Sequence, residues 1–400
     1  RRKLSGQRLS KSDFEAILDE VVGHRYSKVE LSMFVLACAL RQLDTQEIID
    51  FTEAMISTGR RLDVGEGPIA DKHCVGGVPG NRTTMIVVPI LASLGVTIPK
   101  TSSRAITSPA GTADTMGVLA NVALSVEEMQ RIVSDTGGCI AWGGALDLAP
   151  ADDILITVER PMALDTEAQM VASILAKKKT AGATHALIDI PVGDTAKIRT
   201  REEAEFLGSL FTTVSQAIGI EIEVAITEAH GPIGFGIGPR LEALDVLSVL
   251  RSDPEAPMDL REKSLFLAAR ILERVGSASN ASGYRQAQDA LDSGEALSKF
   301  EEIRIAQGKR DIPGAAPFRR EICAASDGRI RGIDCWAIAK VAKLAGAPGN
   351  PSAGVLLRQC VGDVVVKGQP VYEIHAQSET QQEFAQEYVD ANPEIIQLGY

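Results

Sequence analysis

Aromatic residues and positive charge are both scarce in this sequence. Only 4% of its 400 residues are aromatic, and 53 acidic residues against 41 basic ones give a net charge of −12. Proteins that bind single-stranded nucleic acid stack its bases on aromatic side chains, and duplexes and anionic membranes attract basic surfaces. We therefore expect neither nucleic acid nor a membrane as a partner. A small anionic ligand is compatible with this charge, because a few local donors override the net field.

Long hydrophobic runs and paired cysteines are also missing. No apolar run approaches the roughly 18 residues of a membrane-spanning helix. The opening Arg1-Arg2-Lys3, followed by polar residues, is unlike a signal peptide. The six cysteines (38, 74, 139, 323, 335 and 360) form no C-x-x-C pair. This usage predicts free thiols and a cytoplasmic location.

A chain of 400 residues is longer than one compact core usually takes, so two or three domains are expected. The first 60 residues predict three helices, which begin with capping boxes at Ser12…Glu15, Ser27…Glu30 and Asp44…Glu47. Residues 166–181, rich in Ala, Gln, Met and Leu, predict a helix that packs back against these three. We therefore predict a discontinuous helical domain at 1–64 and 152–182.

From Pro68 onward, short apolar runs alternate with glycine-rich turns and amphipathic helices, the pattern of an α/β fold with a mostly parallel sheet. The predicted strands are 69–72, 96–99, 139–141, 186–190 and 221–226, and the helices are 84–94, 125–135, 201–218 and 240–250. The predicted α/β domain comprises 65–151 and 183–314. Short β-type runs at 355–357, 364–366 and 371–375 predict a β-rich α+β module at 315–400.

The segment 72–84 lies between an apolar run and an apolar helix. Its three glycines permit close backbone approach, and the helix start directs N–H groups and its dipole at one place. Lys72 adds a positive charge, and Thr83 and Thr84 add hydroxyl donors. The spacing fits neither the P-loop nor the Rossmann fingerprint. The pattern favours a phosphate-binding loop over a turn that uses its glycines for geometry alone.

A second polar segment, 100–114, also follows a predicted strand and leads into a helix that begins near Thr112. It holds six hydroxyl residues and one arginine, Arg104. Because carboxyl ends of neighbouring parallel strands meet at one edge of a sheet, the two segments should converge on one ligand. The pair favours a joint anion site over two solvated turns.

Motifs in both segments resemble the thymidine phosphorylase family of pyrimidine-nucleoside phosphorylases, and the resemblance extends over nearly the whole chain. They are Lys72-His73-Cys74 with Gly76-Gly77, and Ser102-Ser103-Arg104 with Gly111-Thr112-Ala113-Asp114. The sequence of residues 101–116 is most similar to the type 2, AMP phosphorylase-like branch. That branch carries an extra N-terminal domain of about 80 residues, so this chain looks like one that starts at the helical domain. The resemblance also implies a homodimer formed through the helical domain.

The reaction implied by the resemblance is reversible phosphorolysis. Phosphate attacks C1′ of a nucleoside and releases the base and a pentose 1-phosphate with inversion, so phosphate is a substrate and no cofactor or metal is expected. An oxocarbenium-like centre needs a rigidly held nucleophile and a donor at the leaving base. The resemblance assigns phosphate to Lys72, Thr83, Ser102 and Thr112, and catalytic proton donation to His73 or Asp165. It assigns the nucleoside or nucleotide to Gly77, Ser103, Arg104, Ala105, Ile106, Thr107, Ser108, Ser173, Lys177 and Lys197.

Residue chemistry alone leaves other interpretations of this set open. Asp165 also fits a helix N-cap, which is usually ionised and would need a raised pKa or a proton relay to act as an acid. Lys197 fits either a contact to a 5′-phosphate or an exposed loop lysine. Lys178 and Lys179 fit a solvated helix face.

Three positions depart from the family pattern. Cys74 replaces a serine, Gly117 replaces the glutamate that usually closes the signature, and Val158, with Arg160 nearby, stands where an arginine contacts the pyrimidine. A thiol is a weak donor, so a phosphate contact there is expected to fall to the backbone N–H. The catalytic half of the pattern is matched and the specificity half is not. Thymidine, uridine and AMP therefore all stay candidate substrates.

Two other functions fit parts of the pattern. An anthranilate-type phosphoribosyltransferase has a similar architecture but needs an acidic metal-binding cluster, and the sequence has no convincing one. A non-catalytic nucleotide sensor would keep the anion loops. The run 361–370 is similar to biotinyl or lipoyl carrier folds, but Lys367 lacks the flanking methionines of a biotin site, so a structural β-module is expected.

Overall fold

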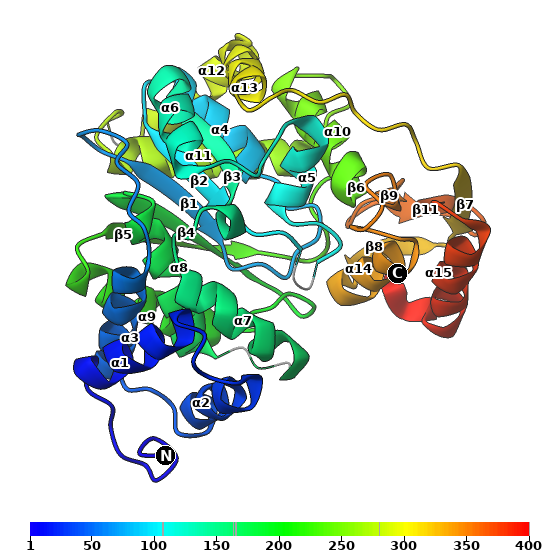
Figure 1. The fold of residues 1–400 in the computed structure, drawn as a ribbon. Coiled ribbons are helices and arrows are strands. Elements are labelled where there is room, and N and C mark those ends of the chain that lie inside the picture. The colour runs from blue at the N-terminus through cyan, green and yellow to red at the C-terminus, as the bar shows by residue number, and fades with distance from the viewer. Residues whose placement is uncertain (106–107, 163, 165, 280, 400) are drawn as a thin grey trace.

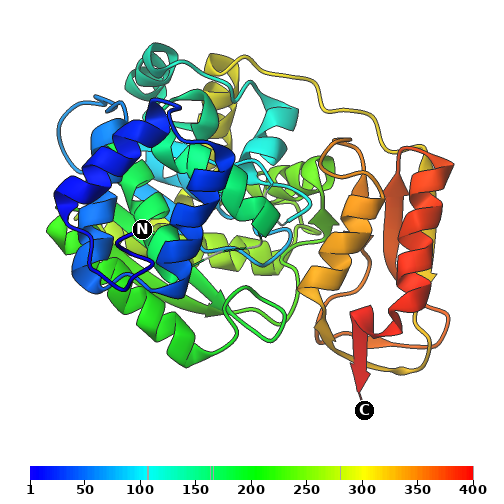
Figure 2. The same ribbon diagram turned by 60° about the horizontal axis from the view of Figure 1, so that its bottom comes forward.

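The computed structural model describes residues 1–105, 108–162, 164, 166–279 and 281–399. Parallel strands lie between two layers of helices, and a smaller module stands to one side (Figures 1 and 2). The predicted class, helices with a parallel α/β sheet and a β-rich C-terminal module, is confirmed. Within these residues, no helix combines the length and apolar character needed to cross a bilayer.

The central strands form two parallel groups that meet at one bridge. One group has the order β1 (Ala70–Cys74), β4 (His185–Val192), β5 (Glu221–Glu228). The other pairs β2 (Ile98–Ser102) with β3 (Gly138–Trp142). A parallel bridge between Ile69 and Thr97 places β1 beside β2. The carboxyl ends of β1 and β2 therefore lie at the same edge, where both polar segments begin.

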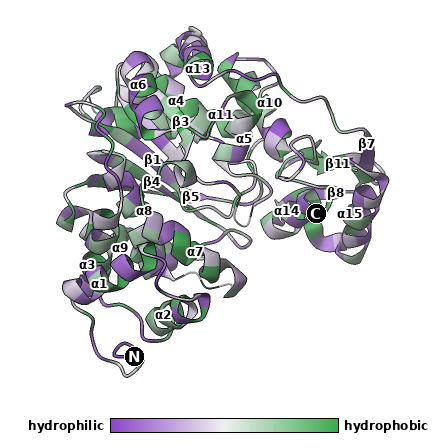
Figure 3. Cartoon of the chain, in the orientation of Figure 1, coloured by the Kyte–Doolittle hydropathy of each residue, from purple (hydrophilic) through white to green (hydrophobic). Residues whose placement is uncertain are grey.

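Helices on one face of the strands share a large apolar core. The sequence of α4 is apolar almost throughout, and every residue from Thr84 to Ala92 is buried, as expected for a helix covered on all sides. Figure 3 shows this helix as a hydrophobic segment in the middle of the upper layer. The helices of this layer are α4 (Thr84–Ser93), α5 (Thr112–Leu119), α6 (Val126–Thr136), α10 (Pro239–Leu250), α11 (Met258–Arg274), α12 (Gly283–Asp292) and α13 (Glu295–Ala306).

The opposite face is covered by helices from three separate stretches of chain. They are α1 (Lys11–Val22), α2 (Lys28–Leu40), α3 (Thr45–Thr58), α7 (Pro150–Met162), α8 (Glu167–Thr180) and α9 (Arg201–Ala217). They share one core with the strands, and α8 packs against α3. The domain boundaries given above stay predictions.

The first capping box is not at the predicted position. The helix begins at Lys11, and the box is closed by Ser10 and Asp13 instead of Ser12 and Glu15. The Asp13 carboxylate accepts a hydrogen bond from the Ser10 N–H at 2.9 Å and also pairs with Arg2 at 2.7 Å. The capping box at Ser10 is favoured because its Asp13 carboxylate also pairs with Arg2. The boxes at Ser27 and Asp44 are as predicted.

The C-terminal module holds two small antiparallel sheets and two helices. One sheet has the order β6-β9-β11-β7, and the other has the order β10-β8-β12. Because β6 precedes α10, its pairing with β9 ties the module to the α/β core. The elements are β6 (Gly236–Ile237), β7 (Phe318–Cys323), β8 (Gly328–Ile333), α14 (Cys335–Leu344), β9 (Gly354–Leu357), β10 (Val364–Val365), β11 (Pro370–Ala376), α15 (Glu379–Ala391) and β12 (Ile396–Gly399).

Candidate active site

The loop after β1 is shaped by glycines that no other residue replaces without strain. Gly77 has φ +87°, and a Cβ there would lie 2.3 Å from the backbone nitrogen of Lys197. Gly80 has φ +74°, and a Cβ there would lie 2.0 Å from the carbonyl oxygen of Ile233. Left-handed backbone and close approach are the two conditions that require glycine. The loop therefore packs directly against the segments that carry Lys197 and Ile233.

Two of the predicted phosphate ligands meet where this loop enters α4. The Lys72 ammonium donates to the Thr83 hydroxyl at 2.7 Å, and that hydroxyl donates to the Asn81 side-chain oxygen at 3.1 Å. Lys72 and Thr83 are both fully buried. Burial lowers the pKa of Lys72, because water no longer stabilises its charge. A lysine in this setting gains from an anion placed at the helix start.

Cys74 closes the same loop from the strand side. Its sulfur accepts a hydrogen bond from the Asn81 side-chain amide at 3.2 Å. Burial raises the pKa of the Cys74 thiol to about 11, so the group stays neutral at physiological pH. All six cysteines of the chain are free thiols.

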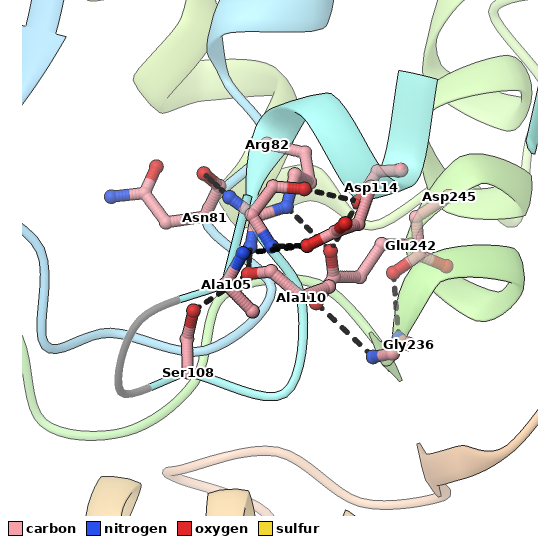
Figure 4. A network of polar contacts seen from close by, with 12 residues as sticks. Asn81, Arg82, Ala105, Ser108, Ala110, Asp114, Gly236, Glu242 and Asp245 are labelled. Carbon is pink, nitrogen blue, oxygen red and sulfur yellow. Dashed lines mark hydrogen bonds and ion pairs between the residues drawn. The ribbon is translucent and has the colours of Figure 1, made fainter. Parts of the chain in front are cut away.

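The second loop is folded onto itself by Asp114, in the first turn of α5. Its carboxylate accepts hydrogen bonds from the backbone N–H groups of Ala105, at 2.6 Å, and Gly111, at 3.0 Å, and pairs with Arg104 at 3.1 Å. The Arg104 guanidinium also lies 4.8 Å from the centre of the Trp142 ring, within cation–π range. Figure 4 shows Asp114 beside Ala105 and Ala110.

The remaining predicted residues of this loop have different surroundings. Ser102 and Thr112 are half-buried and Ser103 is exposed. The Ser108 hydroxyl donates to the Ala110 carbonyl at 2.6 Å. Ile106 and Thr107 lie outside the described residues, as does Asp165, so their predicted roles stay predictions.

His73 lies on the opposite face of β1 from Lys72, because side chains alternate along a strand. Burial lowers the pKa of His73 well below 6.5, and the charges of Lys178 and Lys100 lower it further. A protonated imidazolium is therefore disfavoured at neutral pH. In this environment His73 is a neutral ring that donates one N–H, which narrows its predicted role to hydrogen bonding.

Helix α8 places Ser173 and Lys177 one turn apart, as predicted, but Lys177 already has partners. Its ammonium lies 2.6 Å from the Asp152 carboxylate and 3.3 Å from that of Asp153, both in α7. Ser173 is half-buried. Any contact of Lys177 with a base must therefore compete with this acidic pair.

Lys178 is not the solvated residue that its lysine-rich surroundings predict. Only 2% of it is exposed, and its ammonium lies 2.8 Å from Asp71, which also lies 3.3 Å from Lys100. Burial lowers the pKa of Lys178 to about 7. The expectation is wrong because α8 packs with this side against β1, where Asp71 offers a buried carboxylate. The pair ties the helical layer to the strand that carries Lys72 and His73.

Sequence reasoning missed three charged residues that organise the loops: Asp71, Arg82 and Glu242. Arg82 stands inside the first motif, but its partners are distant in sequence. Its guanidinium donates to the Ala110 carbonyl at 2.5 Å and pairs with Glu242 of α10. The only sequence signal for this role was that Arg82, a charged residue, stands in a segment expected to be buried. Val158, the position aligned with a pyrimidine-binding arginine, is 4% exposed and lies in the helical core.

One surface pocket lies away from these loops. It has a volume of about 370 Å³ and is lined by residues including Thr212, Gly219 and Arg274. It lies at the start of β5, and the two loops follow the carboxyl ends of strands parallel to β5. We take the two loops, and not this pocket, as the candidate active site, because polar side chains converge at the loops.

Comparison with known families covers three parts of the chain. Residues 66–297 match the glycosyl transferase family α/β domain, and residues 1–59 match the helical bundle domain of that family. Residues 329–395 match the pyrimidine nucleoside phosphorylase C-terminal domain.

Similar proteins agree with these matches. "Putative thymidine phosphorylase 1" of Acidovorax sp. (strain JS42) is 51% identical over 400 residues, which is 100% of this chain and 78% of that protein. "Putative thymidine phosphorylase" of Methylococcus capsulatus is 50% identical over 391 residues, 97% of this chain and 75% of that protein.

Among solved structures, the fold is similar to anthranilate phosphoribosyltransferase from Thermus thermophilus. The TM-score is 0.64 at 18% identity, with 76% of this chain and 98% of that chain covered. Such low identity shows the fold alone. With its matched helical bundle, α/β and C-terminal domains and its 51% identical relative, the chain belongs to the thymidine phosphorylase-type branch of the glycosyl transferase family.

Proposed function

We propose that this protein catalyses the reversible phosphorolysis of thymidine or another pyrimidine nucleoside to the free base and (deoxy)ribose 1-phosphate. The coarser assignment, a pentosyltransferase of the nucleoside phosphorylase type, rests on the family and its relatives. The observation that supports phosphate as the attacking substrate is the buried Lys72–Thr83 contact at the start of α4. A fixed ammonium, a hydroxyl and a helix N-terminus are the groups that hold a phosphate. A pyrimidine base is proposed from the C-terminal domain match and the named relatives.

The charge around β1 supports phosphate as the ligand. On one face Lys100 and Lys178 share the single carboxylate of Asp71. On the other face Lys72 lies near Asp189, which Lys263 already contacts at 3.1 Å. Each face therefore has one more lysine than aspartate. The surplus charge on the Lys72 face suits a phosphate anion, whose binding there would relieve the cost of burying Lys72.

In the proposed mechanism a phosphate oxygen held by Lys72 and Thr83 forms a bond to C1′. The C1′–N bond breaks, and its electron pair leaves with the base. Neutral His73 donates a hydrogen bond to the departing base and so stabilises its developing negative charge. Asp165 is the proposed source of the proton that the base takes up.

A second candidate is phosphorolysis of AMP or another nucleoside 5′-monophosphate to ribose 1,5-bisphosphate. Lys197, packed against Gly77, and the exposed Arg104 provide two more cations near the loops. These cations favour a substrate with an additional phosphate.

The deciding experiment is a panel of nucleosides and 5′-monophosphates assayed with inorganic phosphate and ranked by kcat/KM. We expect a pyrimidine nucleoside to rank first. A 5′-monophosphate ranking first would replace the proposal by the second candidate. Arsenate-driven release of free base separates an enzyme from a nucleotide sensor, which would release none. Turnover of anthranilate with phosphoribosyl diphosphate would assign the chain to the phosphoribosyltransferases.

Assembly and location are further proposals. We propose a homodimer formed through the helical layer, where α2 exposes Val29, Met33, Leu36 and Leu40 along one side. Exposed apolar residues grouped on one helix face are typical of a protein–protein interface. A cytoplasmic location is proposed because the six cysteines are free thiols.

A further inference from the structure

Glu242 is a buried carboxylate that contacts both loops of the candidate site without belonging to either. It lies in the first turns of α10, and only 1% of it is exposed. One carboxylate oxygen accepts from the Gly238 N–H, at the start of its own helix, at 3.1 Å. That bond holds the side chain against the loops rather than toward solvent.

The other oxygen of Glu242 joins the two loops. It pairs with the guanidinium of Arg82, from the loop after β1, and accepts from the Thr115 hydroxyl of α5, after the second loop, at 2.8 Å. Arg82 in turn donates to the Ala110 carbonyl in the second loop at 2.5 Å. Figure 4 shows Arg82 between Glu242 and the Ala110 segment. One ion pair therefore sets the spacing of the two loops.

The contacts continue from Arg82 to the groups proposed to hold phosphate. Arg82 directly precedes Thr83, and its guanidinium also donates to the Asn81 carbonyl at 3.1 Å. The Asn81 side chain accepts from Thr83, which accepts from Lys72. On the other side Thr115 lies one helical turn after Thr112. Neither Glu242 nor Arg82 needs to touch substrate to influence these atoms.

The same helix supports the first loop from a second direction. Asp245, one turn after Glu242, accepts from the backbone N–H groups of Phe235 and Gly236 at 2.7 Å each. That segment includes Ile233, whose N–H donates to the Pro79 carbonyl at 3.0 Å. Helix α10 is thus the support of the loop, and Glu242 is its contact with both halves.

We propose that Glu242 is a positioning residue for phosphate, which acts through Arg82 and Thr115 to hold the two loops at one fixed separation. This inference rests on the proposed function, because it concerns the same anion site. An error of about 1 Å in the placement of reacting groups costs about 100-fold in rate. Loss of the Glu242 charge should therefore weaken phosphate binding and turnover more than nucleoside binding.

The test compares Glu242→Gln with wild type by kinetics and by calorimetric titration with inorganic phosphate. We expect kcat/KM for phosphate to fall about 100-fold and the Kd for phosphate to rise, while the KM for nucleoside changes little. The matched control is Glu47→Gln in α3, where a buried carboxylate pairs with Lys3 at 2.7 Å far from both loops. This control should lose thermal stability with unchanged phosphate affinity.

A double variant separates positioning from folding. Replacing both partners of a buried pair by apolar residues removes the unpaired charge and restores stability, so Arg82→Met with Glu242→Met should regain Tm but not phosphate affinity. If it regains both, or if Glu242→Gln binds phosphate as tightly as wild type, the inference is wrong. Wild type that binds phosphate but turns over no nucleoside would overturn the proposed function instead, because the calorimetric comparison does not depend on turnover.

Discussion

Neighbouring residues of β1 have different partners because the strand alternates its side chains between two faces. Lys72 meets Thr83 at the start of α4, while Asp71 meets Lys178 of α8. His73 follows Asp71 toward the α8 face, where burial and two lysines lower its pKa. The proposed mechanism therefore uses Lys72 from one face of the strand and His73 from the other. Each side can be tested by its own substitution.

Lys72 is expected to be the principal cation for phosphate. Lys72→Gln should lower kcat/KM for phosphate by about 100- to 1000-fold, the usual effect of removing one preorganised charge-stabilising donor. Steady-state kinetics at varied phosphate checks this. Lys309→Gln, at an exposed surface pair with Glu301, is the control and should behave as wild type. An equal loss in both variants would contradict the assignment.

His73 is expected to stay neutral throughout the physiological range. Nitrogen NMR of the imidazole should show a neutral ring at pH 6, because the folded pKa lies well below 6.5. His73→Gln keeps an N–H donor and should be about tenfold more active than His73→Leu, the value of one hydrogen bond to developing charge. An imidazolium signal at pH 6 would contradict the prediction that the ring is neutral.

At the scale of elements, α8 is held to the sheet by a buried cluster of two lysines and one aspartate, which carries a net positive charge. Asp71 balances only one of its two lysine partners, and burial lowers the pKa of Lys178 to about 7. The helix is thus docked through an ion pair that titrates near neutral pH.

This titration predicts how stability depends on pH. Between about pH 7 and pH 10.5 the unfolded chain holds the Lys178 proton and the folded chain does not, so the free energy of unfolding rises with pH across this window. Below pH 7 both the folded and the unfolded chain hold the proton, and folding bears the full cost of burying the charged Lys178. Lys178→Met should remove this rise, which amounts to about 1.4 kcal/mol per pK unit.

Urea denaturation of both proteins at pH 6, 8 and 9.5 measures the effect. The variant should gain stability relative to wild type at pH 6 and lose that advantage by pH 9.5. Lys309→Met is the control, with a pH dependence equal to that of wild type. Parallel curves for Lys178→Met and wild type would exclude a titrating Lys178.

At the scale of the whole molecule, one strand pairing joins the C-terminal module to the core, and one apolar helix face is exposed. The pairing of β6 with β9 continues a C-terminal sheet into the segment that precedes α10. On the far side, α2 leaves an apolar row at i, i+4, i+7 and i+11 exposed, from Val29 at 70% to Leu40 at 67%. Such a row at helical spacing is suited to packing against a second helix.

We predict that disrupting this row dissociates the proposed homodimer. Val29→Glu with Leu40→Glu should convert a dimer to a monomer at micromolar concentration in sedimentation velocity, because each charge would be desolvated in the contact. Ile305→Glu, which alters an equally exposed apolar residue of α13 (65% exposed), should remain dimeric. Wild type that sediments as a monomer, or a double variant that stays dimeric, would refute this interface.

Local features of the chain were predictable from the sequence. The start of α4 at Thr84, the succession of the five central strands along the chain and the glycine loop next to Lys72 follow from patterns that span a few residues. Helix periodicity, alternation and glycine turns depend on backbone geometry within one element. This is why the fold class and the position of the first loop follow from the sequence alone.

Pairings between distant residues were decided only by the tertiary structure. Glu242 is 160 positions from Arg82, Lys178 meets Asp71 across two layers, and Lys177 is engaged by Asp152. No periodicity records which carboxylate meets which cation, because charged residues are ordinarily solvated and pair only where packing excludes water. The sequence thus determined which elements form and predicted where an anion binds, and the packing of α8 and α10 decided which buried charges surround the candidate site.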